Sequence, residues 1–190
     1  MASSPPRPSG LLGTLMARVK SLDARIARAT LARFEQHVAD NRPPTPRVRA
    51  ADEAMLRRAL RPERRPLVEH HWATWCTSCV DELPRVAELV ERVSENADVV
   101  AVSWDMFQGH ESIEDAIAEV EQMASRHGFL VPTLVADVEP EILFSALGLS
   151  FHQIPQTRIL DADGGVFRVF EGTLSDEDID TIDSLVRPVG

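Results

Sequence analysis

The sequence is poor in cysteine, in aromatic residues and in long hydrophobic runs. Only two cysteines occur among 190 residues, which is too few for the disulfide framework of a small secreted domain. No apolar run approaches the ~18 residues that a membrane-spanning helix needs. The apolar stretch near the N-terminus, Leu11 to Met16, runs at once into Arg18 and Lys20 and so lacks the pattern of a secretory signal. We therefore expect no transmembrane segment and a cytoplasmic location.

Acidic and basic residues are unevenly distributed. Residues 1–66 hold 14 Lys and Arg against 6 Asp and Glu, whereas residues 67–190 hold 6 against 24. The change in net charge marks a boundary between a basic N-terminal arm and an acidic domain. The basic arm either docks on the acidic domain, binds an anionic partner or is a solvated helix. Nucleic acid is not expected as a partner, because the domain is acidic and aromatic residues make up only 5% of the chain.

The first 65 residues read as an extension of the main domain. Residues 1–10 are rich in Pro and Ser and are expected to be disordered. Residues 11–65 are expected to form a basic helical extension with a Pro-rich linker at 41–46. The helix from Leu11 to about Val38 has an apolar stripe that needs cover, which predicts a dimer or self-docking through this helix. An organelle transit peptide is the alternative, because the first 34 residues are Arg-rich with a single acid, Asp23.

Residues 66–190 alternate between strand and helix patterns. Strands are expected at 67–72, 99–104, 133–136, 157–160 and 166–170, and helices at 77–93, 112–127, 140–147 and after Ser175. A short helix is also expected at 51–60. The turn at 161–165 joins the last two strands into an antiparallel hairpin. This order predicts an α/β sandwich with helices on both faces of the sheet.

The two cysteines lie where an expected strand meets an expected helix. Cys76 would stand at the helix N-terminus, where unpaired backbone N–H groups and the helix dipole stabilise a thiolate. The pKa of its thiol should therefore fall below the ordinary value of about 8.5. Cys79, one turn further on, would be more buried and would resolve a mixed disulfide. A zinc site or an unreactive pair is the alternative, although the sequence has no second CxxC.

Two further features could act beside the cysteines. Glu82 is expected one helical turn beyond Cys79 and could take its proton, or it could serve only the helix dipole. Pro155 follows Ile154 just before a strand, so the peptide bond could be cis beside the cysteines or belong to a plain turn. The residues alone leave both questions open.

Two adjacent histidines fall in the expected central strand. His70 and His71 would point to opposite faces of the sheet. Either could act as an acid or base near the dithiol, or bind copper(I) together with both sulfurs. A hydrogen-bonded core histidine is the alternative for each.

These motifs together resemble a known family. The segment from Leu67 to about Val186 resembles the thioredoxin fold and, more narrowly, the TlpA- and ResA-type thiol–disulfide oxidoreductases. The signature of that family stands here as Trp72-Ala73-Thr74-Trp75-Cys76-Thr77-Ser78-Cys79-Val80-Asp81-Glu82-Leu83-Pro84. The segments 102–105, 128–134 and 154–161 are similar as well. The resemblance implies a thioredoxin-like three-layer α/β/α sandwich with a mixed central sheet, preceded here by an N-terminal helical extension.

The resemblance also implies roles for individual positions. The catalytic group that it implies consists of Cys76, Cys79 and Glu82. The substrate-binding group consists of Trp75, Ile154 and Pro155, with Pro155 as a cis proline. His70 stands where thioredoxin proper has a buried acid, so proton transfer is expected to differ here.

The function predicted from the sequence is thiol–disulfide exchange that reduces protein disulfides, with no cofactor and no metal. Its partners would be a protein disulfide substrate and an upstream electron donor. Two alternatives belong to other classes of protein. One is a copper carrier that uses Cys76 and Cys79 with His70 or His71. The other is a redox-linked interaction module that is recruited by its basic N-terminal helix.

Overall fold

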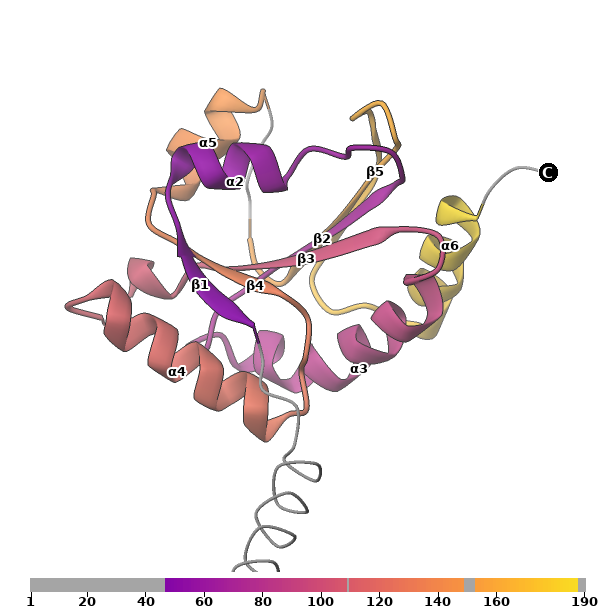
Figure 1. Ribbon diagram of the computed structural model, residues 1–190. Coiled ribbons are helices and arrows are strands. Elements are labelled where there is room, and N and C mark those ends of the chain that lie inside the picture. Colours follow the sequence, from indigo (N-terminus) through magenta and orange to yellow (C-terminus); the bar gives the residue numbers. More distant parts are fainter. Residues whose placement is uncertain (1–46, 109, 149–152, 188–190) are drawn as a thin grey trace, which may run out of the picture. The chain divides into compact units, whose positions relative to one another are not determined.

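The computed structural model describes residues 47–187, apart from residue 109 and residues 149–152 (Figure 1). The expected disorder at 1–10, the expected helix at 11–38 and the linker at 41–46 lie outside the described residues. The compact unit that contains both cysteines runs from Thr45 to Gly190.

One mixed sheet of six strands forms the centre of this unit. The strands are β1 (Val48–Ala51), β2 (Leu67–Trp72), β3 (Asp98–Ser103), β4 (Thr133–Ala136), β5 (Gln156–Leu160) and β6 (Val166–Glu171). They lie in the order β1-β4-β3-β2-β5-β6. The first four in this order are parallel, and β5 and β6 run antiparallel to β2 and to each other. The predicted mixed sheet and its closing hairpin are confirmed.

Helices cover both faces of the sheet, as Figure 1 shows. The α-helices are α2 (Glu53–Ala59), α3 (Thr77–Val93), α4 (Ile113–Arg126), α5 (Pro140–Ala146) and α6 (Asp176–Val186). One face packs on α2 and α5, through a core that includes Leu56 and Leu143. The other face packs on α3, α4 and α6, through cores that include Leu83, Val120 and Ile182. The chain therefore has the predicted three-layer α/β/α architecture.

Side chains at the helix starts fix where the helices begin. Asp52, Ser112 and Ser175 are the N-caps of α2, α4 and α6, and each accepts a hydrogen bond from a backbone N–H in the first turn. Ser175 and Asp178 form a complete capping box, which satisfies two backbone donors that a bare helix end leaves unpaired. The start of α6 after Ser175 is thus as the sequence predicts.

The folded unit begins earlier than the expected boundary at residue 66. Val48–Ala51 pairs in parallel with β4 along its whole length, and Ala51 is fully buried. Leu56 and Leu60 from the following segment also belong to the core. The residues from 48 to 60 were placed in the extension because a four-residue edge strand has too short a pattern to be recognised. The division between residues 65 and 66 is therefore corrected.

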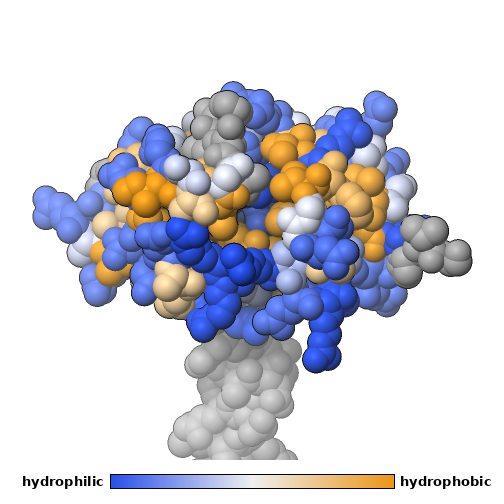
Figure 2. Space-filling view, turned by 90° about the horizontal axis from the view of Figure 1, so that it is seen from above, coloured by the Kyte–Doolittle hydropathy of each residue, from blue (hydrophilic) through white to orange (hydrophobic). Residues whose placement is uncertain are grey.

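Apolar side chains gather in patches on the side of the molecule where α2 and α5 lie (Figure 2). The edge strand β6 contributes three exposed apolar residues, Val166, Phe167 and Val169. Among the described residues, no helix is both long enough and apolar enough to span a membrane.

Candidate active site

The two cysteines form a disulfide at the start of α3. Cys76 is the N-cap of this helix, and its Sγ accepts a hydrogen bond of 3.3 Å from the backbone N–H of Cys79. Cys79 is fully buried, whereas Cys76 is partly exposed. In the reduced protein, a thiolate at Cys76 would lie at the positive end of the 17-residue helix, which stabilises its charge. This is the arrangement that the spacing of the two residues predicts.

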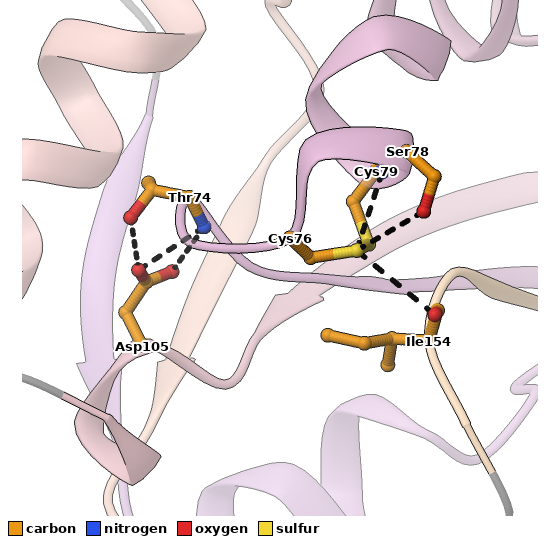
Figure 3. Close-up of a disulfide and its surroundings, with 6 residues drawn as sticks. All are labelled: Thr74, Cys76, Ser78, Cys79, Asp105 and Ile154. Atoms are coloured by element: carbon orange, nitrogen blue, oxygen red, sulfur yellow. Dashed lines mark hydrogen bonds between the residues drawn. A yellow bond between two sulfur atoms is a disulfide. The ribbon is translucent and has the colours of Figure 1, made fainter.

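The loop before β5 forms the second wall of the site. The peptide bond between Ile154 and Pro155 is cis, which confirms the expected isomer. The carbonyl oxygen of Ile154 lies 3.9 Å from Sγ of Cys76 (Figure 3). Trp75, next to Cys76, is 40% exposed. A backbone carbonyl thus lies beside the partly exposed sulfur, and the residue that precedes Cys76 presents an exposed aromatic ring.

Glu82 is a buried acid, with 4% of its surface exposed. One of its carboxylate oxygens accepts a hydrogen bond from the backbone N–H of Leu174, and the other has no partner among the described residues. Burial raises the pKa of Glu82 to about 7, against a smaller opposing effect of the Leu174 N–H. Ser78, Arg85 and Leu174 line an open depression beside this carboxyl group. Glu82 can therefore hold a proton near neutral pH.

The adjacent histidines lie in separate environments. The Nδ1 of His70 is 3.0 Å from Oγ1 of Thr157, and burial lowers the pKa of His70 to about 3, with a smaller contribution from His71. His71 packs on the other face of the sheet, against Trp104 and Phe144. Both rings are fully buried, so both are core histidines.

The structure gives no support to the copper-carrier alternative. In the described part of the chain, no group of three or more His, Cys, Asp or Glu side chains is placed to hold a metal ion. His71 lies near the carboxylate of Glu69, at 3.4 Å, and accepts from the Trp104 ring N–H at 3.3 Å. Both ring nitrogens of His71 therefore have partners in the core that packs on α5.

Thr74 and Asp105 lie beside the site and were not predicted from the sequence as part of it. Asp105 is fully buried, and its carboxylate accepts hydrogen bonds from the backbone N–H and the hydroxyl of Thr74 (Figure 3). The available signal was the position of Asp105 just after β3. Because β2 and β3 are parallel neighbours, residues that follow them meet at the same edge of the sheet.

The chain is similar in sequence to curated thiol-disulfide oxidoreductases. No protein-family model matches the chain. The thiol-disulfide oxidoreductase ResA of Geobacillus thermodenitrificans (strain NG80-2) is 29% identical over 109 residues, which cover 57% of this chain and 55% of that protein. The chain spans 55 to 60% of the length of the curated relatives that it matches.

Solved structures of low sequence identity share the fold. A thiol:disulfide interchange protein of Chlorobium tepidum TLS superposes with a TM-score of 0.52 at 19% identity, covering 76% of this chain and 97% of that one. StoA from Bacillus subtilis superposes with a TM-score of 0.51 at 17% identity, covering 66% and 84%. The chain therefore has the fold of these thioredoxin-like structures, and its sequence resembles that of the ResA-type thiol–disulfide oxidoreductases.

Proposed function

We propose that this chain is a thiol–disulfide oxidoreductase that reduces disulfides in other proteins. The observation that carries the proposal is the placement of Cys76. Its sulfur caps a long helix, accepts the N–H of Cys79 and lies beside the carbonyl of Ile154. This geometry stabilises a thiolate at the surface while its partner sulfur stays buried.

The first chemical step is attack on a substrate disulfide. The thiolate of reduced Cys76 bonds to one substrate sulfur, and the substrate S–S bond breaks. The electron pair leaves with the other substrate sulfur as a thiolate. The exposed Trp75 ring and the Ile154 carbonyl, which lies 3.9 Å from Sγ of Cys76, provide contacts for the substrate chain.

The second step is resolution by Cys79. Its thiol gives a proton to the carboxylate form of Glu82, which lies one turn further along α3. The Cys79 thiolate then attacks Sγ of Cys76, the mixed disulfide breaks, and the second substrate sulfur leaves as a thiolate. The product is the Cys76–Cys79 disulfide that the structure contains. An acid with a pKa of about 7 suits this transfer, because it both accepts and releases a proton near neutral pH.

The cycle closes when an upstream dithiol donor supplies two electrons. The donor thiolate attacks the Cys76–Cys79 disulfide, and the same bonds form and break in reverse order. The protein partners of the proposal are therefore a disulfide substrate and a reductant. No further cofactor enters the balance, because the two sulfurs carry both electrons.

The reduction potential of the Cys76–Cys79 pair tests the proposed direction. The full chain would be equilibrated with dithiothreitol or glutathione buffers in metal-free solution, and the thiols counted. A potential near about −270 mV supports a reductase, whereas one near about −120 mV would indicate an oxidant and contradict the proposed direction. If no disulfide forms, the redox function itself is wrong.

Single cysteine variants test the assigned roles. Cys79→Ser should accumulate a covalent mixed disulfide with a disulfide-bonded substrate protein, because nothing resolves it. Cys76→Ser should form no such complex. The reverse pattern would exchange the roles of the two sulfurs.

The cytoplasmic location expected from the sequence stays a prediction, which cell fractionation would test.

A further inference from the structure

The loop that carries Cys76 is tied down by a buried acid. Ala73–Cys76 connects β2 to α3, and Asp105 lies beneath it with no exposed surface. The backbone N–H of Thr74 lies 3.1 and 3.2 Å from the two carboxylate oxygens of Asp105. The Thr74 hydroxyl donates to the same carboxylate. Figure 3 shows this group beside the disulfide, on the side away from Ile154.

The carboxylate of Asp105 is itself fixed by its surroundings. Asp105 begins the short 3₁₀ segment Asp105–Phe107 that follows β3. The Ser103 hydroxyl donates to Oδ2 of Asp105 and accepts from its backbone N–H. The Nε2 of His110 lies 3.8 Å from Oδ1. A buried carboxylate with several donors keeps one position and acts as a rigid anchor.

Few other hydrogen bonds join the backbone of this loop to neighbouring elements. At its start, the backbone N–H of Trp104 donates to the carbonyl of Trp72. Within the loop, the backbone N–H of Cys76 donates to the carbonyl of Ala73. Between these points, Thr74 makes hydrogen bonds to two residues of other elements. Most of them go to Asp105, and one contact of 3.4 Å joins the Thr74 hydroxyl to Glu119. Thr74 stands two residues before the sulfur at the helix N-cap.

We infer that Asp105 is a positioning residue of the dithiol site. It acts through Thr74 to hold the loop so that Sγ of Cys76 stays at the N-terminus of α3. This inference rests on the proposed function, because a thiolate at Cys76 is what the position stabilises. Asp105 does not touch the sulfur and takes no part in bond exchange.

Positioning and direct charge predict opposite changes in the Cys76 pKa. If Asp105 only contributed its negative charge, its removal would lower the pKa of the Cys76 thiol, because a nearby anion disfavours a thiolate. If Asp105 holds the loop, its removal lets the sulfur leave the helix N-terminus, and the thiol pKa rises. A purely structural role would lower the stability of the fold and leave the pKa unchanged.

The test is the pH dependence of thiol alkylation in the full-length chain. Iodoacetamide would be reacted with the reduced protein in a Cys79→Ser background, so that Cys76 is the only thiol. Asp105→Ala should raise the Cys76 pKa obtained from the pH profile by about one unit, which lowers the alkylation rate about tenfold at a pH well below both pKa values. Thr74→Val should give a smaller fall, since its backbone N–H remains. Thr74→Ser, which keeps both donors, should behave as the parent.

Two control variants separate position from charge and from stability. Glu119→Gln removes a negative charge next to Thr74 and leaves the anchor in place, so it should not raise the Cys76 pKa. Leu56→Ala removes core packing on the other face of the sheet and touches neither Asp105 nor the loop. It should lower the urea midpoint and leave alkylation unchanged. Far-ultraviolet circular dichroism of each variant identifies any that fails to fold, and Thr74→Val then carries the test.

The outcomes distinguish the inference from the proposed function. Slower alkylation in Asp105→Ala and Thr74→Val supports the inference. An unchanged or faster rate in both variants overturns it, while a low thiol pKa in the parent leaves the proposed function standing. A parent whose Cys76 titrates at or above about 8.5 contradicts the proposed function and the inference together.

Discussion

The carboxylate of Glu82 accepts a hydrogen bond from the backbone N–H of Leu174, so the acid on α3 is held against the turn that leads into α6. This contact stabilises the ionised form, whereas burial of the side chain favours the protonated form. Burial has the larger effect, and the pKa of Glu82 rises from 4.5 to about 7. The site therefore contains an acid that changes its protonation state at the pH at which thiols begin to ionise.

The raised pKa of Glu82 predicts a specific pH dependence of stability. Between pH 4.5 and 7, the folded chain binds a proton at Glu82 that the unfolded chain has lost, so the free energy of unfolding falls as pH rises. Glu82→Gln keeps an acceptor for the Leu174 N–H and has no proton to lose. Its stability relative to the parent should rise by about 2 kcal/mol between pH 5 and pH 8.

Urea unfolding of the oxidised proteins at several pH values would measure this difference. Glu88→Gln, at an exposed position on the same helix, is the control for loss of one negative charge from α3. If Glu82→Gln and Glu88→Gln follow the same pH dependence, burial of Glu82 does not raise its pKa in the way described.

His70 predicts the opposite dependence. Its pKa is lowered from 6.5 to about 3, mainly by burial, so the unfolded chain binds a proton that the folded chain rejects. Stability is therefore lost as pH falls from 6.5 towards 3. The parent should lose about 2 kcal/mol at this residue between pH 7 and pH 5. His70→Gln should lack that loss in the same urea titration.

Thr157→Val is a matched control for His70, because it removes the hydroxyl that lies 3.0 Å from the ring. It should lower stability by nearly the same amount at pH 7 and pH 5. If His70→Gln retains the full acid-dependent loss, the loss comes from other groups.

The sequence predicted most of the fold because its patterns are strong where the core is deep. The segment Leu67–Trp72 is apolar at its start and is buried at every position, and α3 has apolar residues at helical spacing that are buried in the structure. The strand β1 escaped notice for a physical reason. Its four residues include Arg49 and follow Arg47, so they show no clear alternation of apolar and polar side chains. They form a strand because they pair with β4, which lies 85 residues away along the chain.

The candidate site shows the same division between local and long-range information. The positions of Cys76 and Glu82 follow from one helix, so spacing along the sequence was enough to place them. The Asp105–Thr74 contact joins residues 31 positions apart, and only the alignment of β2 with β3 brings them together. The Glu82–Leu174 contact spans 92 positions and has no signal in either local segment.

The pairing of β1 with β4 predicts where the chain can be shortened. A chain that begins at Thr45 keeps the compact unit and should retain the cooperative unfolding transition of the parent. A chain that begins at Glu53 loses β1 and Asp52, the N-cap of α2. It should be less stable by at least about 2 kcal/mol, since loss of a cap alone costs about 1 kcal/mol. Thermal unfolding of the two shortened chains and of Asp52→Ala would measure these effects, and equal stability of the two shortened chains would contradict the assignment of β1.

A buried ion pair lies on the face of the sheet opposite α3, the helix that carries Cys79. Nη1 of Arg158 lies 2.9 Å from Oε2 of Glu69, and both side chains are almost completely buried. Removing one partner leaves an uncompensated charge in the core. Arg158→Met should therefore cost about 3 to 5 kcal/mol in the free energy of unfolding.

Removing both charges should cost less than removing one, because the desolvation penalty of each ion then disappears. The double variant Glu69→Leu with Arg158→Met should regain part of the loss, with a coupling energy of about 2 kcal/mol in a double-mutant cycle. Arg57→Met is the matched control, since the Arg57–Glu53 pair has a similar distance of 2.7 Å but is exposed, and its loss should cost less than about 1 kcal/mol. Equal losses in Arg158→Met and Arg57→Met would show that burial adds nothing to the Glu69–Arg158 pair.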